Sequence, residues 1–252
     1  MISNLAAKKE VNVVHQKSLI GILGGMGPTA TVDFLSKVIS ATKADVDQEH
    51  IPLIVHDVPQ IPDRSSAIEN GRDDPFLPML AGIRLLDAAG VEFIAIPCNT
   101  AHYWHGRLQR GCRAKILHIA DAVAHYVTQM AERPRTIAVM ATRGTISGGI
   151  YSQRLLEGAE QVLVPDEGTQ LLIDRAITGV KANQISAARK AATEAAGLLA
   201  DAGADCLLLA CTELPVALSD FDHGPLIMDA TEALARACVR ASVGEARMET
   251  VG

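Results

Sequence analysis

The chain of 252 residues contains few aromatic side chains and no apolar run of the roughly 20 residues that cross a bilayer. Aromatic residues make up 3% of the sequence, so its core must be built mainly from Ala, Val, Leu and Ile. Residues 1–16 form a polar segment that also lacks the apolar stretch of a secretory signal. We therefore expect a cytoplasmic protein that has no contact with a membrane.

An excess of basic residues is also missing. The chain has 23 Lys and Arg residues against 29 Asp and Glu residues, a formal net charge of −6. Nucleic-acid and membrane surfaces attract clusters of Lys and Arg, so this balance argues against either partner. A small anionic ligand remains compatible with the charge if a few basic side chains surround it.

The five cysteines are odd in number and lack the spacing of a disulfide framework. In a reducing compartment they are expected to remain free thiols. Cys206 and Cys238 lie within apolar or helical sequence and fit the role of small core residues, and Cys112 is a further bystander. Cys98 and Cys211 differ, because each ends an apolar run and precedes short polar residues.

The segments that contain Cys98 and Cys211 repeat each other. Residues 85–100 read LLDAAGVEFIAIPCNT, and residues 198–213 read LLADAGADCLLLACTE. Each segment predicts a helix end, a glycine turn and a buried strand, with the cysteine at the same position. Two further pairs of similar segments occur in the same order: 20–34 with 137–151, and 116–123 with 225–232. The sequence therefore predicts two similar halves, each with one thiol at an equivalent place.

Short apolar runs alternate with helical patterns from Ser18 onward, which is typical of an α/β fold with a parallel sheet. The runs are apolar on both faces, as in strands that helices cover on both sides. We predict an α/β fold of two similar Rossmann-like domains with the active-site cleft between them. The expected parts are a flexible leader (1–16), a first domain (17–120) joined by a C-terminal helix (226–245), and a second domain (121–225).

Ligands of parallel α/β sheets bind beyond the carboxyl ends of the strands, which is where Cys98 and Cys211 stand. We expect a helix to begin after each cysteine, and its free N–H groups would lower the thiol pKa and hold a carboxylate. The polar residues that directly follow the cysteines are also suited to holding a carboxylate, namely Asn99, Thr100, Thr212 and Glu213. Two thiols that face each other suit removal of a proton from one face of a carbon and its return on the other.

Interpretations in which the cysteines have no catalytic role also stay open. Both could be inert residues at strand ends. Cys98 and His102 have the spacing of two zinc ligands, but no second Cys or His pair accompanies Cys211, so a metal site is the weaker hypothesis. His102 and His105 could tune the Cys98 thiol or lie at the surface.

Further candidates lie in loops that follow predicted strands. The loop at 21–31 lacks both GxGxxG and GK[ST], so it favours a small carboxylate over a nucleotide. Arg64 could bind a carboxylate in a bidentate manner, although a single Arg, like Lys181, is commonly just solvated. Thr142 and Thr145 could bind a substrate carboxylate or cap a helix.

Several of these segments together resemble the aspartate racemase branch of the aspartate/glutamate racemase family. The matching motifs are IGILGGMGPTATVDF, DQEHIPLIVHDVPQIPDRS, FIAIPCNTAH, GTI, GVKA and ACTE. The resemblance runs from about Ser18 to about Val239. Glutamate racemases share the paired cysteines but usually begin with a DSGxGG-like segment and end the second motif in CTH, and this chain departs from both patterns.

The resemblance implies interconversion of L- and D-aspartate, with glutamate as the alternative, by Cys98 and Cys211 as an acid/base pair that needs no cofactor and no metal. It implies that Arg64 and Lys181 hold the side-chain carboxylate of the substrate. The positions around the α-carboxylate and amino group are Met26, Asn99, Thr100 and Thr212. Relatives are commonly homodimers, so a homodimer is expected.

Two alternatives to racemisation remain. The first keeps the fold but uses mainly one cysteine, as in a maleate isomerase or a decarboxylase. The second is a non-catalytic carboxylate-binding protein. Replacing each cysteine separately tests the first alternative, which predicts that one of the two replacements is nearly silent. Incubation in D₂O tests the second, which predicts that no solvent deuterium enters the α-carbon.

Overall fold

The computed structural model describes residues 17–221 and 224–244, so the predicted leader at 1–16 and residue 245 lie outside the described residues. The first half contains β1 (Ile20–Gly24), α1 (Pro28–Ala41), the 3₁₀ helix η1 (Asp47–Glu49), β2 (Leu53–Asp57), α2 (Arg64–Glu69), α3 (Phe76–Ala88), β3 (Phe93–Ala95), the 3₁₀ helix η2 (Thr100–Trp104), α4 (His105–Gln109) and β4 (Lys115–Ile116). The second half contains α5 (Ile119–Thr128), β5 (Thr136–Ala141), α6 (Arg143–Ser147), the 3₁₀ helix η3 (Arg154–Glu157), β6 (Gln161–Leu163), α7 (Glu167–Lys181), α8 (Ile185–Asp201), β7 (Cys206–Ala210), α9 (Leu214–Ala217), β8 (Leu226–Asp229) and α10 (Ala230–Val243). Among these helices, none has the length and hydropathy that a membrane span requires.

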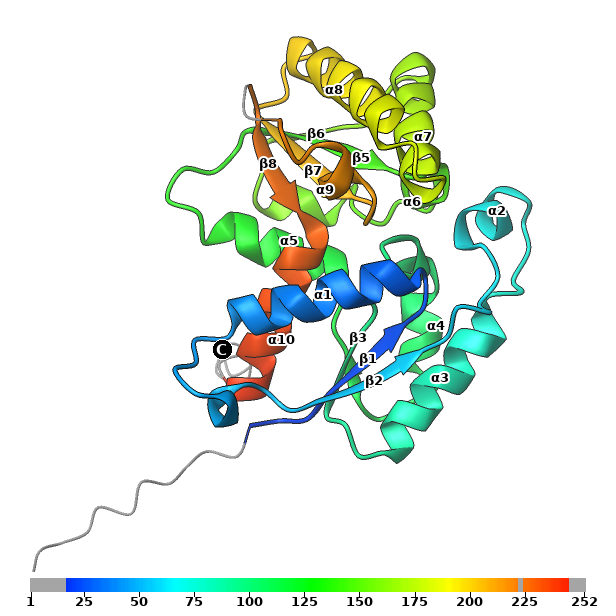
Figure 1. Ribbon diagram of the computed structural model, residues 1–252, viewed down its shortest axis with the longest axis vertical. Helices are drawn as coiled ribbons and strands as arrows, with labels where there is room; N and C mark the ends of the chain where they lie inside the picture. The colour runs from blue at the N-terminus through cyan, green and yellow to red at the C-terminus, as the bar shows by residue number, and fades with distance from the viewer. Residues whose placement is uncertain (1–16, 222–223, 245–252) are drawn as a thin grey trace, which may run out of the picture.

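The strands form two four-stranded sheets, and every strand pair in them is parallel. The order is β2-β1-β3-β4 in the first sheet and β6-β5-β7-β8 in the second. The two orders are equivalent, since the third strand of each half pairs with its first strand. The prediction of an α/β fold with two similar parallel sheets is confirmed (Figure 1).

The alternation of side chains along the central strands divides the apolar residues between separate cores. In β5, Ile137 and Val139 belong to a core shared by both sheets, whereas Ala138 and Met140 belong to the core beneath α7 and α8. The shared core also draws residues from α1, α5 and α10, which lie between the sheets in Figure 1. Each Val, Leu or Ile side chain buried there contributes about 1.5–3 kcal/mol.

The C-terminal segment predicted as one helix over 226–245 begins instead with a strand. Residues 226–229 form β8, which pairs with β7 and completes the second sheet, so the prediction is wrong for these residues. The helix α10 starts only after Asp229, because the Asp229 carboxylate accepts the Thr231 N–H at 2.8 Å and caps the helix. α10 packs on α1 and α5 and against strands of both sheets, so it ties the two halves together.

A second contact joins the halves near the carboxyl ends of the strands, where α2 packs against α6. The N–H of Gly144 in α6 donates to Ser65 Oγ in α2 at 2.8 Å. A Cβ atom at Gly144 would lie 2.6 Å from the Cα atom of Ser65, so only glycine allows this approach.

Gly144→Ala is therefore expected to lower the free energy of unfolding by about 1–3 kcal/mol, because the new methyl group must displace the backbone of α2. Urea unfolding of the variant and the wild type measures the difference. Gly197→Ala is the matched control, since its Cβ atom would meet nothing within 4 Å in the exposed face of α8. That change should raise stability by about 0.5–1 kcal/mol. Equal stability of Gly144→Ala and the wild type would contradict the close contact.

Candidate active site

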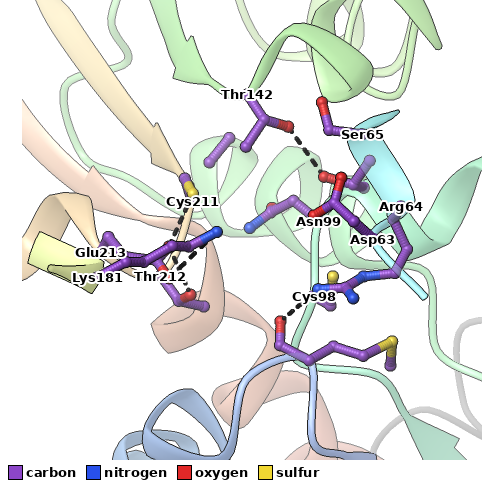
Figure 2. Close-up of a pocket in the computed structure, with 13 residues that line it drawn as sticks. Asp63, Arg64, Ser65, Cys98, Asn99, Thr142, Lys181, Cys211, Thr212 and Glu213 are labelled. Atoms are coloured by element: carbon purple, nitrogen blue, oxygen red, sulfur yellow. Dashed lines mark hydrogen bonds and ion pairs between the residues drawn. The ribbon is translucent and has the colours of Figure 1, made fainter. Parts of the chain in front are cut away.

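Cys98 and Cys211 lie beyond the carboxyl ends of equivalent strands. Cys98 comes shortly after the end of β3 at Ala95, and Cys211 directly follows Ala210, the last residue of β7. Both thiols line one cavity of about 40 Å³, and both are buried. The sequence repeat thus corresponds to two thiols, one from each half, in a single cavity (Figure 2).

Every predicted site residue except Thr145 lines this cavity: Met26, Arg64, Cys98, Asn99, Thr100, Thr142, Lys181, Cys211, Thr212 and Glu213. Asp63 and Ser65 line it as well, and neither was predicted from the sequence. Asp63 could have been found as a helix cap, because its carboxylate accepts the Ser66 N–H at the start of α2. Figure 2 shows Asp63 and Arg64 on one side of the cavity, and Lys181 and Glu213 with Cys211 on the other.

Backbone carbonyl groups hold the guanidinium group of Arg64. Its Nη1 donates to the carbonyl oxygens of Ile61 at 3.2 Å and Pro62 at 3.0 Å. Its Nη2 donates to the carbonyl oxygen of Met26 at 3.1 Å. The Nε atom of Arg64 is buried and has no hydrogen-bond partner in the described part of the chain. These three hydrogen bonds fix the orientation of Arg64 and leave two of its five N–H groups, at Nε and Nη2, for a ligand.

Cys211 interacts directly with a carboxylate. Its thiol donates to Glu213 Oε2 at 3.0 Å, and the Thr212 hydroxyl donates to the same oxygen at 3.1 Å. Lys181 Nζ lies 3.9 Å from the other oxygen, Glu213 Oε1. Burial raises the pKa of the Cys211 thiol well above its usual range, and the charge and hydrogen bond of Glu213 raise it further. Cys211 therefore rests as a thiol that can donate a proton.

The helices that follow the two cysteines are shorter than expected. The 3₁₀ helix η2 covers only Thr100–Trp104, and α9 covers only Leu214–Ala217. The helix dipole sums over aligned peptide units, so such short helices place little positive charge at the thiols. The predicted lowering of the thiol pKa is wrong for Cys211, where burial and the Glu213 carboxylate dominate.

The side chain of Asn99 is oriented by a residue that was not predicted from the sequence. The hydroxyl of Tyr151, a buried residue of the second half, donates to Asn99 Oδ1. Asn99 Nδ2 is buried and, among the described residues, has no hydrogen-bond partner. In Figure 2 this nitrogen points toward the side of the cavity that holds Cys211. Nothing in the local sequence GIYSQ marks Tyr151, because its role depends on contact between the halves.

Three threonine hydroxyls from both halves meet beside Asn99. Thr100 Oγ1 lies 3.0 Å from Thr142 Oγ1 and 2.8 Å from Thr145 Oγ1, and the last two lie 3.0 Å apart. Thr142 caps α6 by accepting the Thr145 N–H at 3.3 Å, which confirms the capping interpretation. Thr145 is buried and does not line the cavity, so it supports the other two hydroxyls.

The two histidines that follow Cys98 do not line the cavity. His102 is buried, with Nε2 at 3.1 Å from the carbonyl oxygen of Ile96 and Nδ1 accepting the Ile119 N–H at 3.5 Å. Burial holds the pKa of His102 well below its usual range, so the ring is neutral. Both ring nitrogens are thus occupied by the backbone and do not form a zinc site with Cys98. No group of three or more metal-ligating side chains occurs in residues 17–221 and 224–244.

The remaining cysteines lie outside the cavity. Cys206 and Cys238 are fully buried in the shared core, which confirms their prediction as core residues. Burial raises the pKa of each of these two thiols to about 12. Cys112 is half-buried and is a free thiol like the others.

Glu213→Gln is expected to make Cys211 more reactive toward iodoacetamide at neutral pH. The Glu213 charge raises the pKa of the Cys211 thiol, so its removal lowers that pKa and increases the thiolate fraction. A change of one pKa unit corresponds to a rise of about tenfold in the alkylation rate below the pKa. Peptide mapping by mass spectrometry gives the rate at Cys211, with the rate at Cys98 in the same sample as the control. An unchanged or slower rate at Cys211 would show that Glu213 does not control this proton.

Comparison with known proteins supports a common origin with amino-acid racemases. The family described as Asp/Glu/Hydantoin racemase matches residues 23–238. The structure resembles the aspartate racemase of Picrophilus torridus, with 32% identity, a TM-score of 0.78, and coverage of 90% of this chain and 94% of that chain. The chain is 28% identical over 227 residues to the broad specificity amino-acid racemase RacX of Bacillus subtilis (strain 168), covering 88% of this chain and 96% of that protein. The glutamate racemase of Francisella tularensis shares the fold, at 16% identity and a TM-score of 0.64 over 92% of this chain and 83% of that one.

Proposed function

Because the chain belongs to the Asp/Glu/Hydantoin racemase family, we propose that it interconverts L- and D-aspartate through the thiols of Cys98 and Cys211. The observation that carries the proposal is that two thiols, at equivalent strand ends of the two halves, share one cavity with two basic side chains. The relatives named as an aspartate racemase and as a broad specificity racemase support racemisation as the reaction. The proposed reaction uses no pyridoxal phosphate. The expected homodimer stays a prediction.

The charged groups of the cavity match those of an amino acid. Arg64 and Lys181 supply positive charge for carboxylates, and Asp63 and Glu213 supply negative charge for an ammonium group. Arg64 Nε and Asn99 Nδ2 are buried donors that have no partner within the described residues, so the carboxylates of a substrate would satisfy them. An unpaired buried donor costs about 1–3 kcal/mol, so a ligand that accepts both hydrogen bonds is favoured.

The proton transfers follow from the state of Cys211. Cys211 holds its proton beside Glu213. When the reaction starts with Cys211 protonated, Cys211 is therefore the group that donates a proton to the α-carbon. The thiolate of Cys98 removes the α-proton, and the electron pair of the C–H bond stays on the α-carbon and its carboxylate. Cys211 then gives its proton to the opposite face, and its sulfur becomes the thiolate that starts the reverse reaction. Hydrogen-bond donors that are already oriented around the substrate carboxylate stabilise the negative charge of the carbanion.

Cys98→Ser and Cys211→Ser are each expected to lower kcat for racemisation of L-aspartate by about 10²–10⁴-fold, because a hydroxyl is a far weaker acid than a thiol. The loss of optical rotation in buffer without added pyridoxal phosphate measures the rate. Cys112→Ser is the matched control and should keep full activity, since Cys112 lies outside the cavity.

Two outcomes would contradict the proposal. If one of the two serine variants kept nearly full activity, the reaction would use mainly one cysteine, as in a maleate isomerase or a decarboxylase. If the wild type bound L-aspartate without changing its optical rotation, the protein would be a carboxylate-binding protein.

A further inference from the structure

A second and much larger cavity adjoins the one that holds the two thiols. Its volume is about 920 Å³, against about 40 Å³ for the inner cavity. The residues that line both cavities form a neck between them: Met26, Arg64, Lys181, Thr212 and Glu213. We call the larger space, which lies between the start of α1, the end of α7, the start of α8 and α9, the outer cavity.

The inner cavity offers much less free space than the outer cavity, about 40 Å³ against about 920 Å³. A long side chain attached to an α-carbon between the two thiols therefore has most of its room beyond the neck. The outer cavity is the space into which it passes.

The charges around the neck do not require an acidic side chain. Arg64, Lys181 and a substrate ammonium group supply three positive charges, and Asp63, Glu213 and a substrate α-carboxylate supply three negative ones. These six charges add up to zero, so the neck is electrically balanced when the side chain of the substrate is uncharged. An aspartate side chain would add one negative charge beside Glu213, which already lies 3.9 Å from Lys181.

The wall of the outer cavity suits an uncharged side chain. Its apolar residues come largely from helices or their ends and include Pro28, Ala30, Val180, Ile185, Pro215 and Val216. Two charged side chains of the wall already have partners of opposite charge. Asp33 pairs with Lys37, and Arg189 pairs with Asp220. A flexible apolar chain would lose water on entering this cavity without separating those pairs.

We propose that the outer cavity is a side-chain subsite, and that the enzyme also racemises amino acids with long, flexible and uncharged side chains, for which methionine is the probe. The inference rests on the proposed function, because the subsite acts only if the two thiols transfer protons. It extends the substrate class from acidic amino acids to uncharged ones whose side chains reach past the neck. Aspartate has a short side chain that ends at the neck, beside Arg64 and Lys181.

Val216→Trp tests the subsite by narrowing the outer cavity from the side of α9. The expected result is a fall in kcat/KM for L-methionine of about tenfold or more, with a change for L-aspartate of less than about twofold. Val243→Trp is the control, because Val243 is 40% exposed, close to the 46% of Val216, and does not line the cavity. Ala30→Leu narrows the cavity from the side of α1 and should cause the same selective loss. Deuterium incorporation at the α-carbon in D₂O measures each rate.

The possible failures of the two proposals are separable. If the wild type exchanges the α-proton of L-aspartate but not that of L-methionine, only the subsite is overturned. If Val216→Trp lowers both rates equally, the subsite is also overturned, because the outer cavity then serves only as an entrance. If the wild type exchanges no amino acid, the proposed function itself is overturned.

Discussion

The helical layer between the two sheets is the constraint on which the site depends. α1, α5 and α10 fill one core with apolar residues from both sheets, so the sheets cannot move independently without exposing that core to water. The carboxyl ends of β3 and β7 are held at one cavity as a result, and each end carries a thiol. The hydrogen bond between Ser65 and Gly144 and the contact between the Thr100 and Thr142 hydroxyls join the two halves again at the wall of the cavity.

The two halves repeat in backbone but differ in charge. Asn99 follows Cys98, whereas Thr212 and Glu213 follow Cys211. The carboxylate of Glu213 keeps a proton on Cys211 and also faces Lys181, so one residue affects both the proton supply and the charge that a substrate side chain meets. This asymmetry fits the proposed two-step proton transfer, in which one cysteine donates a proton and the other removes one.

The sequence predicted those features that a local pattern determines. The repeated segments around Cys98 and Cys211 predicted equivalent strand ends, because strands buried on both faces have a distinctive apolar pattern. Tyr151 was missed because its contact with Asn99 exists only after the halves meet. The lowered pKa expected for Cys211 was wrong because burial and the position of the Glu213 carboxylate are tertiary properties. The apolar run before Asp229 forms a strand where one helix was predicted, since Asp229 starts the helix later than expected.

We propose that the two thiols act on opposite faces of one α-carbon. The most direct test is the early time course of deuterium incorporation when L-aspartate is incubated with the enzyme in D₂O. Two opposed thiols predict that newly formed D-aspartate carries deuterium while the remaining L-aspartate still carries protium, because each thiol exchanges its own proton with solvent. Deuterium that appears in the remaining L-aspartate as fast as in D-aspartate would contradict two-thiol transfer, since a single group would then remove and return the proton.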